Sequence, residues 1–206
     1  MIVLHVIPLA AADPVFAIDL RRVLAVREGP LVHPMQNTSH FDRCNGDGFL
    51  TYSPPDSEGK VWVYLQPFRN GCLEAVDSSL SWEQKNSRVF YGQSYEDTVL
   101  EALRRYLALF EQLGVPVPLA VTISLLGVKG YAVQPSGGPQ GFVFPELAQS
   151  FDSSIGSDTL LLPEVVLESY AADVQRVLRP TFDVLWNASG YDGSPSYDDK
   201  GNWLRQ

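Results

Sequence analysis

The chain has 206 residues, 45% of them hydrophobic and 11% aromatic, so it can bury a core of its own. Its formal net charge of -9 disfavours a surface that grips the phosphates of nucleic acid, and no apolar run approaches the roughly 20 residues that span a bilayer. Its two cysteines, Cys44 and Cys72, are too few for a disulfide scaffold and fit a reducing compartment. We therefore expect a cytoplasmic protein without a secretory signal, which neither binds nucleic acid directly nor enters a membrane.

The predicted elements begin with a buried strand. Ile2–Ile7 is apolar and rich in β-branched residues, and Pro8 ends it. Residues 18–26 predict a short helix with Asp19 in its first turn, and residues 31–46 predict irregular structure. Because the strand begins at the second residue, we expect the chain to be a fragment whose upstream domain is missing.

An antiparallel meander is predicted next, from strand patterns at 49–53, 61–68 and 72–77. Asn70-Gly71 joins the last two strands, and this dipeptide is typical of a type I′ turn. Counting outward from that turn gives the predicted pairs Phe68 with Leu73, Gln66 with Ala75, Leu65 with Val76, and Tyr64 with Asp77.

The meander also supplies the candidate binding residues, because its side chains alternate between two faces. The aliphatic face carries Val61, Val63, Leu65 and Val76. The aromatic face carries Trp62, Tyr64 and Phe68. A row of partly exposed aromatic side chains is typical of a ligand site or protein interface. The alternative is that a C-terminal helix covers this row through Phe182, Leu185 and Trp186.

The clearest helix is predicted over 94–113, with Ser94 as N-cap, apolar residues at helical spacing and Gly114 just past its end. We expect it to cover the sheet. Further strands are predicted at 119–126, 131–133 and 159–162, and a flexible loop at 134–141. A last helical region runs from 169 to 187, and we expect Pro180 to kink it or break it into two helices.

These elements predict one α+β domain over residues 1–206, a mostly antiparallel sheet with helices packed largely on one face. The sequence has no phosphate-binding loop, nucleophile elbow or HExxH motif. His40, Asp42, Cys44 and Asp47 lack the spacing of zinc or calcium sites, so we expect no catalytic residues, no metal and no cofactor. The alternative hypothesis is a metal-dependent hydrolase or nuclease-like enzyme that uses Asp42, Asp47 and His40.

Four motifs carry a resemblance to a known family: NGDGFLTYS at 45–53, YLQPFRNGCLEAVDS at 64–78, SLLGVKGY at 124–131 and LRPTFDVLWNASG at 178–190. Together they resemble the C-terminal region of bacterial proteins with an AlbA-type, Schlafen-related DNA-binding domain. The resemblance implies a non-enzymatic accessory domain, for ligand sensing or protein–protein assembly, in a DNA-binding regulatory or defence-type system. Its implied partner is the upstream DNA-binding domain or another protein.

Overall fold

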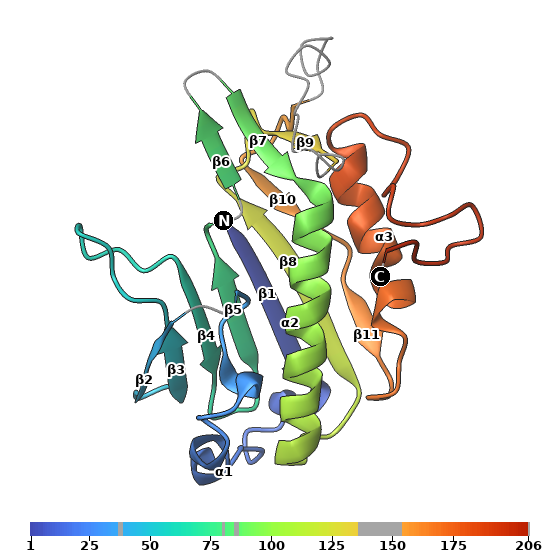
Figure 1. The fold of residues 1–206 in the computed structure, drawn as a ribbon. Coiled ribbons are helices and arrows are strands. Elements are labelled where there is room, and N and C mark those ends of the chain that lie inside the picture. Colours follow the sequence, from blue (N-terminus) through green and yellow to red (C-terminus); the bar gives the residue numbers. More distant parts are fainter. Residues whose placement is uncertain (37–38, 80, 85–86, 136–153, 206) are drawn as a thin grey trace.

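The computed structural model describes residues 1–36, 39–79, 81–84, 87–135 and 154–205, and is built around one eight-stranded antiparallel sheet (Figure 1). The strand order is β10-β8-β1-β5-β4-β3-β2, and β11 also pairs with β8. The strands are β1 (Ile2–Pro8), β2 (Phe41–Cys44), β3 (Phe49–Tyr52), β4 (Val63–Pro67), β5 (Leu73–Asp77), β8 (Leu119–Leu126), β10 (Thr159–Leu161) and β11 (Val165–Leu167). A second sheet, β6 (Ser81–Gln84), β7 (Ser87–Tyr91) and β9 (Ala132–Gln134), contains one parallel pair, β7 with β9.

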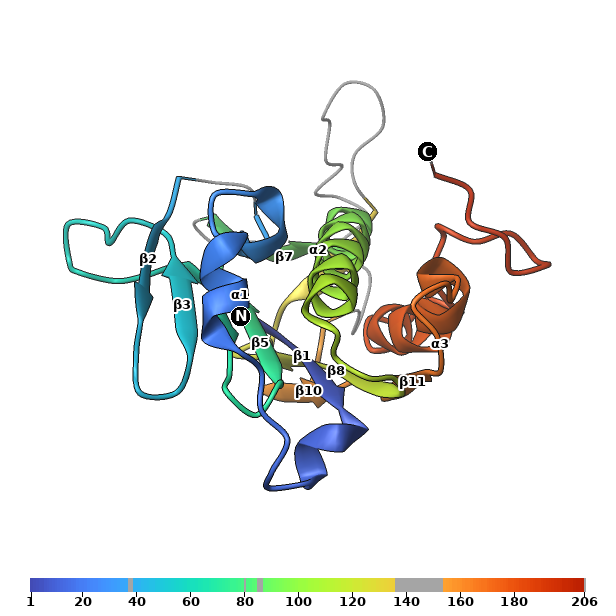
Figure 2. The ribbon, with the colours of Figure 1, turned by 90° about the horizontal axis from the view of Figure 1, so that it is seen from below.

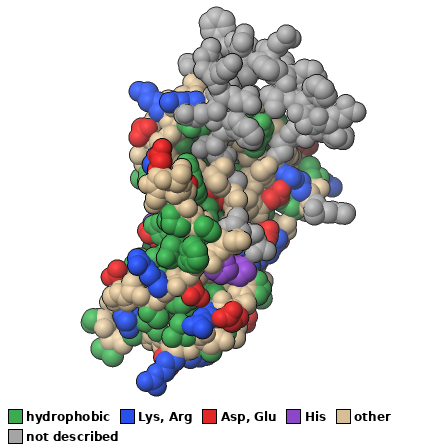
Figure 3. Space-filling model, turned by 60° about the vertical axis from the view of Figure 1, so that its left-hand side comes forward, with side chains coloured by type: hydrophobic (Ala, Val, Ile, Leu, Met, Phe, Trp, Pro, Cys, Tyr) green, Lys and Arg blue, Asp and Glu red, His purple; other side chains and the backbone are tan. Residues whose placement is uncertain are grey.

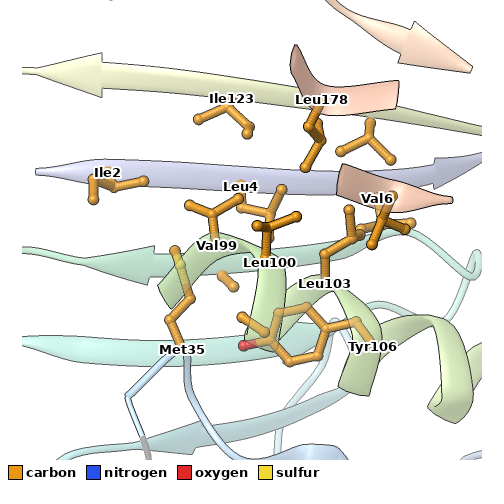
Figure 4. Close-up of a cluster of buried hydrophobic side chains, with 14 of the residues drawn as sticks. Ile2, Leu4, Val6, Met35, Val99, Leu100, Leu103, Tyr106, Ile123 and Leu178 are labelled. Carbon is orange, nitrogen blue, oxygen red and sulfur yellow. The ribbon is translucent and has the colours of Figure 1, made fainter. Parts of the chain in front are cut away.

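The helices lie on one face of the large sheet, which confirms the predicted α+β architecture (Figure 2). They are α1 (Leu20–Ala25), α2 (Gly92–Leu113) and α3 (Val174–Asn187), with short 3-10 turns η1 (Leu9–Ala12) and η2 (Pro30–Val32). The inner face of β1 presents Leu4 and Val6 to Leu100 and Leu103 of α2, and all four side chains are buried (Figure 4). The core therefore lies between α2 and the middle of the sheet.

Two predicted helix details are wrong. The long helix begins at Gly92 after the N-cap Tyr91, not at Ser94. A Cβ at Gly92 would collide with the ring of Trp186, so glycine allows α2 and α3 to approach closely at this end. Of the kink or break expected at Pro180, the break does not occur, because α3 continues through this proline as one helix. The predicted end at Gly114 is confirmed by its φ of 74°.

The predicted register of the β4–β5 hairpin is wrong by one residue. Phe68 N–H donates to the carbonyl of Cys72 (2.8 Å), so three residues form the loop instead of two. Gly71 has a φ of 81°, which fits a three-residue loop that ends in a left-handed residue rather than a type I′ turn. The pairs are Pro67 with Leu73, Gln66 with Glu74, Leu65 with Ala75, Tyr64 with Val76, and Val63 with Asp77.

This one-residue shift exchanges the two faces of β5 relative to the prediction. Val76 lies beside Tyr64 on the outer face, not among the aliphatic side chains of the inner face. Val63 and Leu65 are buried as expected, but Val61 precedes β4 and is 39% exposed. Of the loop predicted at 134–141, residues 136–141 lie outside the described part of the chain.

Candidate functional site

The outer face of the sheet is the candidate site, because no α-helix of the described chain covers it (Figure 2). Trp62 is 45% exposed, and Phe41 of the edge strand β2 is 54% exposed. The alternative in which α3 covers the aromatic row is wrong, because Phe182 and Trp186 are fully buried in the core on the inner side. Exposed aromatic side chains on a bare sheet face are typical of a protein interface.

The three predicted binding residues differ in exposure. Trp62 is the exposed one, and its backbone is fixed by hydrogen bonds: its N–H donates to Ser53 Oγ (3.1 Å), and its carbonyl accepts from Ser78 N–H (2.9 Å). Tyr64 and Phe68 are half-buried. The structure therefore places Tyr64 in β4, with Trp62 just before the strand and Phe68 just after it.

A hydrogen-bonded network lies beside the aromatic row and joins three strands. Nε2 of His5 lies 2.8 Å from Oε2 of Glu74, and the Tyr64 hydroxyl donates to Oε1 of Glu74 (2.6 Å). Burial and the neighbouring Glu74 raise the pKa of Tyr64, so its hydroxyl keeps its proton at neutral pH. The predicted β4–β5 register places Glu74 on the face opposite Tyr64, and the sequence pattern does not show that β1 pairs with β5, so this network was not expected.

Aromatic side chains extend this surface toward the sheet edge. The rings of Phe41 and Tyr52 lie 6.0 Å apart, and the guanidinium of Arg43 lies 5.8 Å from the Tyr52 ring. Figure 3, which turns the left-hand side of the molecule in Figure 1 forward, shows hydrophobic side chains gathered between charged ones, with histidine among them. The outer face thus combines apolar contact area with fixed polar groups.

The alternative metal-site residues are placed along the β2–β3 hairpin. Asp42 pairs with Thr51 across the hairpin, while Asp47 lies in its turn. The ring of His40 packs against that of His33, with centroids 4.4 Å apart and ring planes tilted by 54°. Within the described ranges, no three histidine, cysteine, aspartate or glutamate side chains are grouped in a way that could hold a metal ion.

Two carboxylates are buried in the core, and the sequence pattern did not reveal either. Glu96 of α2 accepts hydrogen bonds from Nε1 of Trp186 (2.8 Å), from Oγ of Ser194 (2.5 Å) and from Oγ of Ser196. Asp77 is also fully buried and accepts from the N–H and hydroxyl of Ser79 (both 2.7 Å). Burial raises the pKa of both carboxyl groups. Since Glu96 joins α2, α3 and the C-terminal segment, its contacts stabilise the fold.

Comparisons with family models, with curated proteins and with solved structures give no match. The resemblance to AlbA-type proteins therefore gains no support from them. Among the described residues, no helix combines the length and the apolar character needed to cross a membrane. The feature of the molecule that bears on function is therefore the outer face of the sheet.

Proposed function

We propose that this chain is a non-enzymatic accessory domain that binds another protein through the outer face of its sheet. The observation that carries the proposal is the exposure of Trp62 and Phe41 on a sheet face that no described helix covers. Large aromatic side chains supply much of the binding energy of protein interfaces. The fixed polar network of His5, Glu74 and Tyr64 adds directional contacts beside them.

The proposed setting is a cytoplasmic DNA-binding regulatory or defence-type bacterial system, which rests on the sequence resemblance. Because the net charge is -9, we expect a partner protein or an upstream domain, and not this domain, to contact DNA. In that arrangement this domain binds the partner protein and does not bind the phosphates of DNA.

Site-specific photocrosslinking in the source cells tests the interface. A photoreactive phenylalanine derivative at position 62 should give a discrete adduct with a protein that carries a DNA-binding domain. The matched control is position 204, because Leu204 is an equally apolar side chain, 60% exposed, outside the sheet. Identical adducts from both positions, or none from position 62, would overturn the proposal.

A gel-shift titration tests the DNA part of the proposal. The chain alone should not bind duplex DNA below micromolar concentrations, because its surface carries a net negative charge. Tight binding that weakens steeply with added salt would instead show that this domain contacts the phosphates itself, and would contradict its accessory role.

A further inference from the structure

A groove on the helical side of the molecule is separate from the outer sheet face. It has a volume of about 260 Å³ and lies between α2 and the segment that leads into α3. Arg104, Leu107 and Glu111 line it from α2, at the spacing of one helix face. Tyr170, Asp173 and Val174 line it from the other side.

The groove contains one cationic and two anionic side chains with an apolar surface between them. Arg104 and Glu111 are separated by two helical turns, which corresponds to about 10 Å along the axis of α2. Asp173 belongs to the opposite wall. In the part of the chain that the structure describes, none of these three side chains belongs to an ion pair. The buried side chains of Leu107 and Val174 supply the apolar surface.

Hydrogen bonds hold the polar walls of the groove in place. With its amide oxygen turned toward them, Gln175 accepts from Nη2 of Arg104 (3.0 Å) and from Nε1 of Trp203 (3.1 Å). The Tyr170 hydroxyl donates to the carbonyl of Val115 (2.6 Å). Asp173 is the N-cap of α3, and its Oδ1 accepts from the N–H of Arg176 (3.3 Å).

The electrostatics of the groove are also asymmetric. Burial and the nearby carboxylate of Glu111 raise the pKa of Tyr170 to about 12, so its hydroxyl stays protonated and the negative charge at this end is that of Glu111. The guanidinium of Arg104 gives the other end a positive charge. The groove as a whole carries one more negative charge than positive.

We propose that this groove binds a cationic α-amino acid of the lysine, ornithine and arginine class. Arg104 binds the α-carboxylate, and Asp173 on the facing wall binds the α-ammonium group. The aliphatic chain lies along Leu107, and the side-chain cation reaches Glu111 beside the ring of Tyr170. The net charge of such a ligand, +1, matches the charge of the groove. This site adds a small-molecule ligand to a domain whose proposed function is protein assembly.

Titration of the full chain with L-lysine tests the proposal. Calorimetry measures the binding, and the NMR resonances of the indole N–H groups report where it occurs. We expect saturable binding with a dissociation constant on the order of 1 mM or tighter. The signal of Trp203 should shift because its Nε1 shares Gln175 with Arg104, whereas the signal of Trp62 should not. Norleucine, which lacks the side-chain cation, and cadaverine, which lacks the carboxylate, should each bind at least about tenfold more weakly.

Three variants test whether lysine binds in the groove or elsewhere on the acidic surface. Glu111→Gln and Asp173→Asn should each weaken lysine binding about tenfold, and asparagine retains the capping function at 173. Glu28→Gln is the matched control, because its side chain is 90% exposed and does not line the groove, and it should bind as the wild type does. The proposal is overturned by an absence of saturable lysine binding, by equal binding of cadaverine, or by groove variants that bind like the control.

Discussion

Among single residues, the buried carboxylate of Glu96 has a marked effect on the pH dependence of stability. Burial raises its pKa in the folded state, so the folded protein holds this proton more tightly than the unfolded chain. The free energy of unfolding therefore falls as the pH rises from the ordinary carboxyl pKa to the raised one. Glu96→Gln keeps hydrogen-bond acceptor capacity and removes the ionisation.

Urea unfolding of wild type and Glu96→Gln between about pH 4 and pH 8 measures this effect. The stability of the variant relative to the wild type should increase with pH. Glu101→Gln is the control, because the Glu101 side chain is 71% exposed on the same helix. The difference in unfolding free energy between this variant and the wild type should not change with pH. A constant difference for Glu96→Gln as well would show that the Glu96 carboxyl group titrates normally.

Truncation of Leu103 should lower the stability of the fold far more than truncation of Trp62. Leu103 is fully buried on the face of α2 that packs against the sheet, so Leu103→Ala should lower the free energy of unfolding by roughly 2 to 5 kcal/mol. Trp62 is 45% exposed, so Trp62→Ala should cost less than about 1 kcal/mol and leave the fold available for binding assays. Thermal and urea unfolding of the two variants measure both values, and a large loss for Trp62→Ala would mean that its ring supports the core.

At the scale of elements, the hairpin loop between β4 and β5 depends on Gly71. Both Gly71 and Gly59 have positive φ, 81° and 78°, so alanine is strained at either position, by roughly 1–2 kcal/mol. A Cβ at Gly71 would also lie 2.6 Å from Cε1 of Phe16, whereas a Cβ at Gly59 would meet no atom within 4 Å. Gly71→Ala should therefore lower the melting temperature more than Gly59→Ala, and equal shifts would mean that Phe16 moves aside freely.

Elements with a strong periodic pattern could be predicted from the sequence. The alternation at Leu119–Leu126 gives β8 with its observed bounds, and the apolar stripe of α2 identifies the covering helix. β2 could not be predicted, because all of its side chains are exposed and no alternation marks it. No strand is predicted at β11, although β9 and β10, which also have three residues each, are predicted.

The candidate site could be predicted only in part. The alternation of side chains along one strand predicts that Trp62 and Tyr64 share a face, because this alternation does not depend on how the strand pairs with its neighbours. The Tyr64–Glu74 contact depends on the β4–β5 register, and the loop that sets this register is not the type that Asn70-Gly71 favours. The His5–Glu74 contact depends on the pairing of β1 with β5, two strands far apart in the sequence. The groove beside Arg104 brings together two segments about 65 residues apart, and such a contact leaves no local pattern in the sequence.

At the scale of the whole molecule, stability should be unevenly distributed across the sheet. β1 pairs with β5 on one side and with β8 on the other, whereas β2 is an exposed edge strand. Native-state hydrogen exchange should show the amides of β1 opening only with global unfolding, and those of β2 exchanging by local fraying. Equal protection in the two strands would mean that the sheet unfolds as one unit.

The central place of β1 has a consequence for synthesis on the ribosome. The hydrogen bond from the backbone nitrogen of Met1 to the carbonyl of Leu126 spans 125 positions. At a translation rate of ~5–20 residues per second, one side of this apolar strand stays without its partner for about 6–25 s. During that time the nascent chain exposes an apolar, β-branched segment with which other unfolded chains can pair. The order in which the strands are made, rather than the final packing, therefore sets the period in which this protein is most prone to aggregate.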